Sequence, residues 1–407
     1  MIKTFQLTIN KSDKKIDFLD FFFLLSIIAI SYGINEIPIL FSIYILLNRR
    51  TLKLKSKITY FLLSVLLSGT FLSVFTYFNF DTITSIDSQN IFLRIRFYWI
   101  RIIYAISVSS YLYNKSYIKI IHIIYVLAIA NLITGILQLI IGFINDEFSR
   151  ISMLSLEPSS SSMFYVFSAP LLIIYEQYAP KKKKYIYSFL FLGLFIISKA
   201  QIIILTFWIF LYFFRVRNIL FFLLIPLLMI IYPFLLELKQ ISVMINLYNV
   251  YNIEGLAGFN PSNEVWTSFT LRISSWISAL SIIITNPFGV GFGQFHLLYK
   301  EFMNNSEIGE FITGPIIMNI LNGEGMYATP KSSLMELIVS SGLFFILPFV
   351  KFSRKIFNKK NNFFIKISCF SLILSSLMVE IAPFLTYLVF IIILNEKSAI
   401  KNINQTN

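Results

Sequence analysis

Long apolar runs recur along this 407-residue chain, and each must be buried in protein or in lipid. A helix that crosses a bilayer needs about 20 mainly apolar residues. Hydrophobic residues make up 57% of the chain and charged residues 13%, whereas soluble domains carry roughly 25% charged residues. The sequence therefore excludes an ordinary water-soluble globule. It predicts an all-α integral membrane protein with about twelve transmembrane helices. The predicted spans are 18–32, 37–47, 58–78, 91–113, 118–144, 160–178, 185–198, 200–214, 219–236 and 333–350, with two more in 363–394, where Glu380, Ala382 and Pro383 interrupt the run.

Lysine and arginine gather in the connections on one side of the predicted bundle. This one-sided distribution arises when the short runs 18–32 and 37–47 form a hairpin and 185–198 and 200–214 form another. Basic residues accumulate in cytoplasmic loops, so both termini are predicted to be cytoplasmic. The same rule accounts for the net charge of +14, and we expect no nucleic-acid partner.

One large polar connection, residues 237–332, lies on the outer side between the ninth and tenth predicted helices. Within it, residues 267–285 carry apolar side chains at helical spacing. This pattern predicts an amphipathic helix that lies in the membrane interface or against the bundle and does not span the membrane. The whole chain, 1–407, is predicted to be a single membrane domain. The apolar positions of the helix are Ile273, Trp276, Ile277, Leu280, Ile283 and Ile284, and we expect Ser274, Ser275, Ser278 and Ser281 to face away.

Cysteine and histidine are scarce. Cys369 is the single cysteine, and His122 and His296 are the two histidines. A disulfide framework or a cysteine metal site within one chain is therefore excluded, and we expect no metal and no cofactor.

Several basic residues fall outside the cytoplasmic connections. Arg94 and Arg101 are seven residues apart and share one face of the fourth helix. A charge as deep as Arg101 faces either a partner, here Glu336 or Glu380, or a wet cavity. Four other basic residues adjoin predicted spans on the outer side, where converging positive charge suits an anionic ligand such as phosphate. They are Arg150, Lys199, Arg272 and Lys331.

Two further segments have both a structural and a chemical interpretation. Glu157-Pro158-Ser159 is typical of a capped helix start, and Glu157 could alternatively activate a hydroxyl group at the outer mouth. The glycine-rich segment 286–293 follows an amphipathic helix instead of a strand. A nucleotide site is therefore disfavoured, and tight backbone turns explain its glycines.

These motifs, in this order, resemble the O-antigen polymerase and O-antigen ligase superfamily. The resemblance covers roughly residues 150–348. Ligases of this pattern carry His-Asn before the helix that re-enters the membrane, whereas this chain has Pro330-Lys331, which favours a polymerase. The motifs are Arg150-x6-Glu157-Pro158-Ser159, Ser198-Lys199, Arg272-x3-Trp276-x9-Asn286-Pro287 with the glycines that follow, and Pro330-Lys331-Ser332-Ser333-Leu334 with Gly342.

The resemblance implies a GT-C-like glycosyltransferase of the bacterial cytoplasmic (inner) membrane. Such an enzyme joins oligosaccharide repeat units of O-antigen or capsule, carried on undecaprenyl diphosphate, at the outer face of the membrane. A chain-length regulator and a flippase of the same pathway are expected partners besides the bilayer. The implied catalytic residues are Arg150, Arg272 and Glu157. Lys199, Lys331, Arg101 and Arg94 are the predicted substrate-binding residues, and Lys199 stands where the family has arginine.

Other function classes compete with this one. A lipid-linked oligosaccharide flippase also has about twelve helices, but short loops and pseudo-symmetric halves are typical of it. The long connection 237–332 therefore speaks against a flippase. An O-antigen ligase and a non-catalytic membrane scaffold or sensor are the remaining alternatives. A scaffold predicts that no single outer arginine matters.

Overall fold

The computed structural model describes residues 15–48, 57–79, 85–145, 152–155, 158–196, 264–305, 315–322, 328–358, 361–379 and 383–406. Every regular element in these ranges is a helix, so the predicted all-α class is confirmed for the described part. Two short 3-10 turns, Pro180–Lys182 and Gly193–Ile196, flank one of the helices. The α-helices are α2 (Phe18–Ser31), α3 (Glu36–Leu47), α4 (Lys57–Asn79), α5 (Ser85–Tyr113), α6 (Tyr117–Ile144), α7 (Pro158–Tyr178), α8 (Lys183–Leu192), α12 (Glu264–Thr285), α13 (Phe295–Asn305), α15 (Pro315–Asn322), α16 (Ser333–Ser341), α17 (Leu343–Ile356), α18 (Phe363–Met378) and α19 (Phe384–Thr406).

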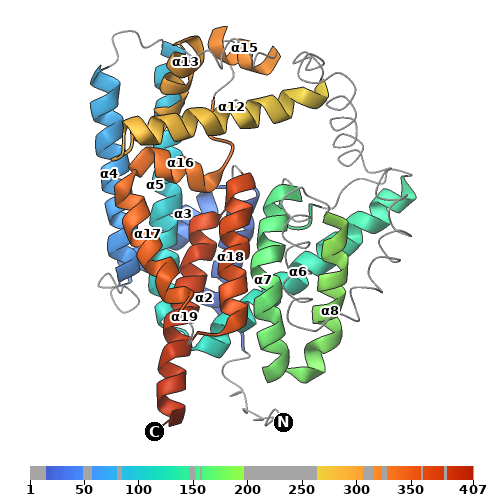
Figure 1. Cartoon of the computed structure of the whole chain (residues 1–407). Helices are drawn as coiled ribbons and strands as arrows, with labels where there is room; N and C mark the ends of the chain where they lie inside the picture. The colour runs from blue at the N-terminus through green and yellow to red at the C-terminus, as the bar shows by residue number, and fades with distance from the viewer. Residues whose placement is uncertain are drawn as a thin grey trace, which may run out of the picture.

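The helices form a bundle with a cap at one end. In Figure 1, α2, α4, α5, α7, α18 and α19 run roughly along one direction, and α12 lies across their upper end with α13 and α15 beyond it. Polar side chains at Asp17, Ser116, Ser332 and Asn362 accept hydrogen bonds from backbone N–H groups in the first turns of α2, α6, α16 and α18. Such caps satisfy donors that have no partner inside the helix and so fix where each helix begins.

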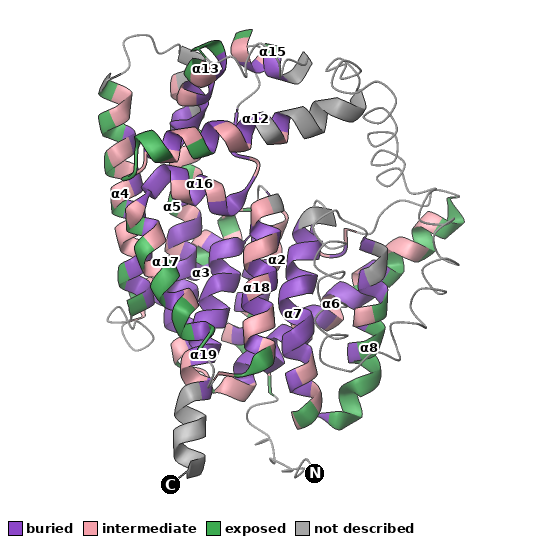
Figure 2. Cartoon of the chain, in the orientation of Figure 1, coloured by how far each residue is buried: buried purple, intermediate pink, exposed green. Residues whose placement is uncertain are grey.

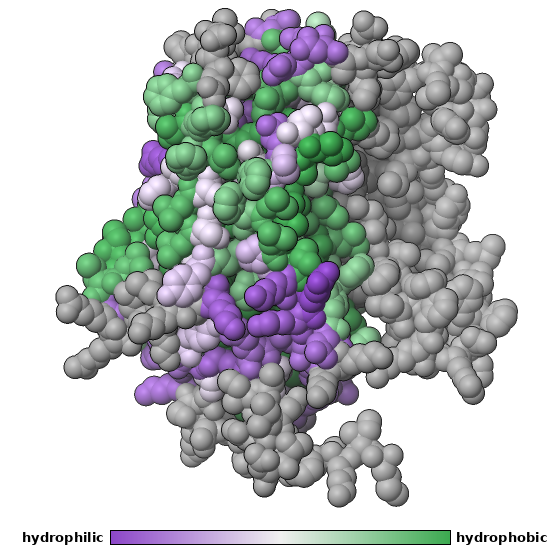
Figure 3. All heavy atoms as spheres, turned by 60° about the vertical axis from the view of Figure 1, so that its left-hand side comes forward, coloured by the Kyte–Doolittle hydropathy of each residue, from purple (hydrophilic) through white to green (hydrophobic). Residues whose placement is uncertain are grey.

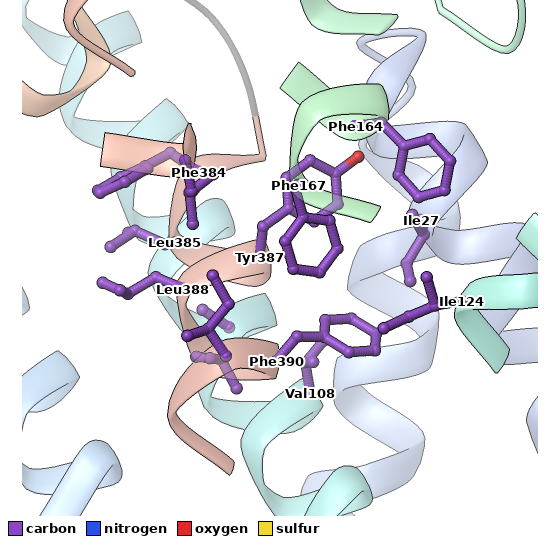
Figure 4. Packing of buried hydrophobic residues seen from close by; sticks show 14 of the residues in the cluster. Ile27, Val108, Ile124, Phe164, Phe167, Phe384, Leu385, Tyr387, Leu388 and Phe390 are labelled. Carbon is purple, nitrogen blue, oxygen red and sulfur yellow. The ribbon is translucent and has the colours of Figure 1, made fainter. Parts of the chain in front are cut away.

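Aromatic side chains fill the middle of the bundle. The rings of Phe167 in α7 and Tyr387 in α19 stack with centroids 4.8 Å apart, and Phe390 meets Phe167 edge-on at 6.1 Å. Figure 4 shows these rings between α7 and α19, with Ile27 and Ile124 closing the other side. This cluster joins helices from both ends of the sequence, and Figure 2 shows that α7 and the first half of α19 are buried over most of their length.

The outward faces of the bundle are apolar as well. Within the described residues, two helices are long and apolar enough to cross a membrane, Lys57–Phe78 and Tyr117–Ile144. On the first, large side chains at Leu67, Phe71 and Phe78 form one stripe and are 63%, 70% and 79% exposed. Figure 3 shows hydrophobic surface across the middle of the α4 side, with hydrophilic surface gathered below it. Soluble monomers rarely expose apolar patches of this extent, so this surface fits a lipid environment. The predicted runs 200–214 and 219–236 lie outside the described residues.

One end of the bundle collects both described chain ends. Asp20 near the start of α2 is fully buried, and its carboxylate oxygens lie 2.5 Å from Nζ of Lys115 and Nζ of Lys119. Near the end of the chain, Tyr113 donates a hydrogen bond of 2.5 Å to Glu396. These contacts gather around the turn between α5 and α6, at the opposite end from α12 (Figure 1).

The predicted span 333–350 is wrong as a single helix. The structure divides it at Gly342 into α16 and α17, and Gly342 has φ +49°. A Cβ at this position would lie 2.2 Å from the carbonyl carbon of Phe288 and 2.3 Å from the Pro287 oxygen. The close approach of the glycine-rich segment therefore requires glycine here and ends the helix. The predicted division of 363–394 is confirmed, since α18 and α19 are separate helices on either side of residues 379–383.

The predicted amphipathic helix is present as α12, and its serine face packs against neighbouring helices. Ser274, Ser275 and Ser278 are fully buried, whereas Leu280 is 53% and Ile284 80% exposed. Small serine side chains allow α12 to pack closely on α13 and α16, and Ser274 hydrogen-bonds the hydroxyl of Tyr299 at 2.9 Å. Leu280 and Ile284 point outward, as on a helix at a membrane interface, whereas Trp276, Ile277 and Ile283 are partly buried.

Candidate functional site

The short helix α16 is the element around which the described residues of the predicted site gather. Its N-terminal residues are fixed to the end of α18, because the Ser332 hydroxyl donates to the Ser376 carbonyl (3.0 Å) and the Ser333 hydroxyl to the Val379 carbonyl (2.7 Å). Lys331, directly before the N-cap residue Ser332, has the unusual φ of +53°. This backbone turn directs the chain from the cap of the bundle into α16.

The glycine-rich segment holds α16 against α4. Val290 N–H donates to the Val339 carbonyl and Gly291 N–H to the Ser340 carbonyl, both at 2.9 Å. On the other side, the Ser73 hydroxyl in α4 donates to the Phe292 carbonyl (2.9 Å). The segment therefore works as a backbone clasp between two helices, which agrees with tight turns as the interpretation of its glycines.

Glu336 in α16 joins α5 to the site. Its carboxylate Oε1 lies 3.7 Å from Nη1 of Arg94, and its side chain hydrogen-bonds Tyr98. The ring of Tyr98 stacks on Phe292 of the clasp with centroids 4.7 Å apart. Glu336 is 5% exposed. The expected ion pair of Glu336 therefore forms with Arg94 and not with Arg101.

Arg101 lies seven residues after Arg94, about two turns further along α5, and is 8% exposed. Its guanidinium carbon sits 4.2 Å from the ring centroid of Phe97. Within the described residues, Nε and Nη1 of this guanidinium have no hydrogen-bond acceptor. Glu380, the other expected partner, lies outside the described residues.

Arg272 and Lys331 come together although they are distant in the sequence. Nη1 of Arg272 in α12 donates to the carbonyl oxygen of Lys331 at 3.5 Å, and both side chains are half-buried. His296 in α13, which the sequence analysis did not assign to the site, supports the same segment, because its Nδ1 accepts a hydrogen bond of 2.9 Å from the Ala328 N–H. Nothing in the local sequence of His296 indicates this contact.

The structure thus brings four of the seven predicted site residues around the N-terminal half of α16: Arg94, Arg101, Arg272 and Lys331. The other three, Arg150, Glu157 and Lys199, lie outside the described residues. The chamber expected between Arg150 and Arg272 therefore stays a prediction.

Polar groups also surround the described residues next to Glu157. A small cavity of about 10 Å³ is lined in part by Asn131, Ser155, Ser160 and Ser161. The hydroxyl groups of Ser155 and Ser161 are hydrogen-bonded at 2.8 Å. Within the described residues, no group of three or more histidine, cysteine or acidic side chains is arranged to hold a metal ion.

Comparisons with known proteins give one distant relative. No family model matches the chain, and no solved structure matches it. An uncharacterised 49.5 kDa protein in the cps region of Klebsiella pneumoniae is 27% identical over an alignment of 187 residues, which covers 42% of this chain and 42% of that protein. The match thus spans less than half of the relative.

Proposed function

We propose that this protein is a polymerase of bacterial surface polysaccharide. In this proposal it spans the cytoplasmic membrane about twelve times, with both termini in the cytoplasm and the connection 237–332 outside. It joins oligosaccharide repeat units carried on undecaprenyl diphosphate. The observation that carries the proposal is the convergence of Arg94, Arg101 and Arg272 around α16, at the end of the bundle opposite the basic turn Lys115 to Lys119.

The similarity to the Klebsiella pneumoniae protein supports a role in capsule synthesis but does not indicate which reaction is catalysed. The cps region is a capsule region, so the likeness favours a role in capsular polysaccharide. A polymerase, a flippase and a ligase all act on lipid-linked glycans in such a pathway. The choice among them rests on the ordered arginine motifs and on Pro330-Lys331 before α16.

The proposed reaction forms a glycosidic bond and releases a diphosphate. An acceptor hydroxyl oxygen attacks the anomeric carbon of the donor glycan, and the bond from that carbon to the diphosphate oxygen breaks. The electron pair leaves with undecaprenyl diphosphate, and the hydroxyl proton passes to a base, which we assign to Glu157.

Fixed cations stabilise the charge that develops on the leaving group. We assign this role to Arg272 and Arg150, because a guanidinium group can donate two parallel hydrogen bonds to phosphate oxygens. Lys331 and Lys199 would add charge at the mouth. The ion pair with Glu336 positions Arg94 on the same side.

A deletion strain complemented with variants tests the proposal. Arg272→Ala should shift the surface polysaccharide from long chains to single repeat units, because loss of one such donor slows a reaction about 10²-fold or more. Arg96→Ala is the matched control, since Arg96 is an exposed arginine of α5, the helix that carries Arg94 and Arg101. Protein level is checked on a blot.

Each competing function predicts a different result. A flippase predicts that single units disappear from the outer face together with the long chains. A ligase predicts that long chains accumulate on the lipid carrier. Long chains of unchanged length in Arg272→Ala would contradict an enzymatic role for this arginine.

A further inference from the structure

A cavity opens beside Arg101, between the middle of α5 and the ends of three other helices. Its wall is formed by α5, α16, the start of α19 and Ile30 at the end of α2. The space not filled by atoms is about 410 Å³ including the open side, and the interior that a water-sized group can reach is about 30 Å³. Figure 4 shows Phe384 and Leu385, two of its apolar lining residues, at the start of α19.

Arg101 is the charged residue of this lining. It is 92% buried, and Nε and Nη1 have no acceptor among the described residues. Buried charged groups are ordinarily paired, because removing an ion from water without compensation is costly. The face of the Phe97 ring and the more distant carboxylate of Glu336 offset part of the charge, but neither accepts these two N–H groups. An anion bound beside the guanidinium group would supply the missing hydrogen-bond acceptor and balance its charge.

The size of the interior limits what the anion can be. A cavity needs roughly 10–15 Å³ of such space to hold one water molecule. The 30 Å³ beside Arg101 therefore admits a small group such as a phosphate oxygen cluster or a carboxylate, and excludes a sugar ring. The hydroxyl group of Thr386, which also lines the cavity, is a further candidate for a hydrogen bond to such a group.

The apolar part of the cavity lining indicates which kind of molecule carries the anion. Ile30, Leu337, Phe384 and Leu385 are apolar, so a ligand whose charged head reaches Arg101 would lay hydrocarbon against them. This combination fits an isoprenoid or alkyl phosphate better than a free phosphate, because a free phosphate has no hydrocarbon to pack against the apolar lining.

We propose that the cavity beside Arg101 binds the phosphate end of a lipid phosphate, as a second anion site separate from Arg272 and Lys331. The inference rests on the proposed function, in which two lipid-linked molecules meet and two lipid diphosphates must be held at once. One site would take the leaving group, and the cavity beside Arg101 would hold the other lipid. Arg101 is thus a substrate-binding residue outside the bond-breaking centre.

Direct binding tests the proposal. The protein in nanodiscs is titrated with radiolabelled farnesyl phosphate, and empty nanodiscs give the background. We expect saturable binding that weakens at least about 10-fold in Arg101→Met and stays unchanged in Arg96→Met, the exposed arginine of the same helix. Farnesol, which lacks the charge, should not compete, and inorganic phosphate should compete only at much higher concentration.

Three results would overturn the proposal. Equal affinity of the native protein and Arg101→Met would remove the arginine from the site. Competition by farnesol as strong as by farnesyl phosphate would show that the phosphate is not recognised. Competition by inorganic phosphate as strong as by farnesyl phosphate would show a free-anion site without a lipid component.

A second variant guards against misfolding. If Arg101→Met does not elute as a folded protein, Arg101→Lys takes its place. Lysine keeps the positive charge but loses the planar pair of donors, so the affinity of this variant for farnesyl phosphate should be lower than that of the native protein but still measurable. Native affinity in Arg101→Lys would contradict recognition by the guanidinium group. Because the assay measures binding and not chain length, a failure here leaves the polymerase test with Arg272 intact, and the reverse also holds.

Discussion

The clasp between α4 and α16 gives the sharpest prediction about the fold around the site. Gly291 has φ +96°, a conformation that residues with a Cβ rarely adopt. A Cβ added there would lie 2.1 Å from the backbone nitrogen of Ser73 and 2.6 Å from the carbonyl carbon of Leu72. Both atoms belong to the backbone of α4, which cannot move aside without breaking helical hydrogen bonds. Gly291→Ala places a Cβ in this contact.

Two costs add in this variant. Holding a residue with a Cβ in an unfavourable backbone region costs about 1–3 kcal/mol. Overpacking against fixed neighbours costs about 1–3 kcal/mol more. We thus expect a loss of about 2–6 kcal/mol in the free energy of unfolding, and a lowering of Tm by about 2–7 °C. If α4 and the glycine-rich segment separate to relieve the clash, the hydrogen bond from the Ser73 hydroxyl to the Phe292 carbonyl also breaks.

Cys369 provides the assay. It is the only cysteine and is fully buried, so a thiol-reactive fluorescent dye reports unfolding without any label being introduced. Gly142→Ala is the matched control, because Gly142 is in a helical turn of α6 and alanine favours helix there by about 0.5–1 kcal/mol. A Gly291→Ala melting curve as stable as that of Gly142→Ala would refute the backbone clasp.

Three further variants test other contacts. Asp20→Asn leaves Lys115 and Lys119 without their buried carboxylate and should lower stability by about 3 kcal/mol in the same thiol assay; an unchanged Tm would contradict the buried ion cluster. Glu336→Gln should cost up to about 3 kcal/mol, and adding Arg94→Met should restore part of it, whereas strictly additive losses would mean that the pair is not coupled. In a Cys369→Ala background, a fluorophore on Ile284→Cys should be quenched by brominated lipids and one on Ser278→Cys should not, and the reverse pattern would invert the faces of α12.

Helix positions follow well from the sequence where apolar runs are long and bounded by polar residues. The predicted runs 58–78, 91–113, 118–144 and 160–178 lie within helices of the structure, because length and hydropathy alone decide them. The break between α18 and α19 was also predictable from Pro383, which cannot continue the hydrogen-bonding ladder.

Features that depend on tertiary contacts were not predictable. The division at Gly342 arises from the approach of Phe288 and Pro287, which are more than fifty residues away in the sequence. The serine face of α12 is buried because small side chains let helices pack closely. An amphipathic pattern alone does not say whether the apolar face meets protein or lipid.

The sequence predicted which types of residue form the candidate site, but not which of these residues contact one another. Basic residues on the outer side were recognisable, yet neither the choice of Arg94 as the partner of Glu336 nor the contact of His296 with Ala328 has a signal in the sequence. Arg101 shows the same limit, since only the structure reveals that it lines a cavity and that its Nε and Nη1 have no acceptor among the described residues.

Reconstitution tests the central claim most directly. The purified protein in liposomes is supplied with the lipid-linked repeat units extracted from the deletion strain, and products are resolved by mass. A polymerase should convert them into a ladder spaced by one repeat unit, with one undecaprenyl diphosphate released for each bond formed, and Arg272→Ala should leave single units. Repeat units that cross the liposome membrane without ever being joined would contradict the polymerase and identify a transporter.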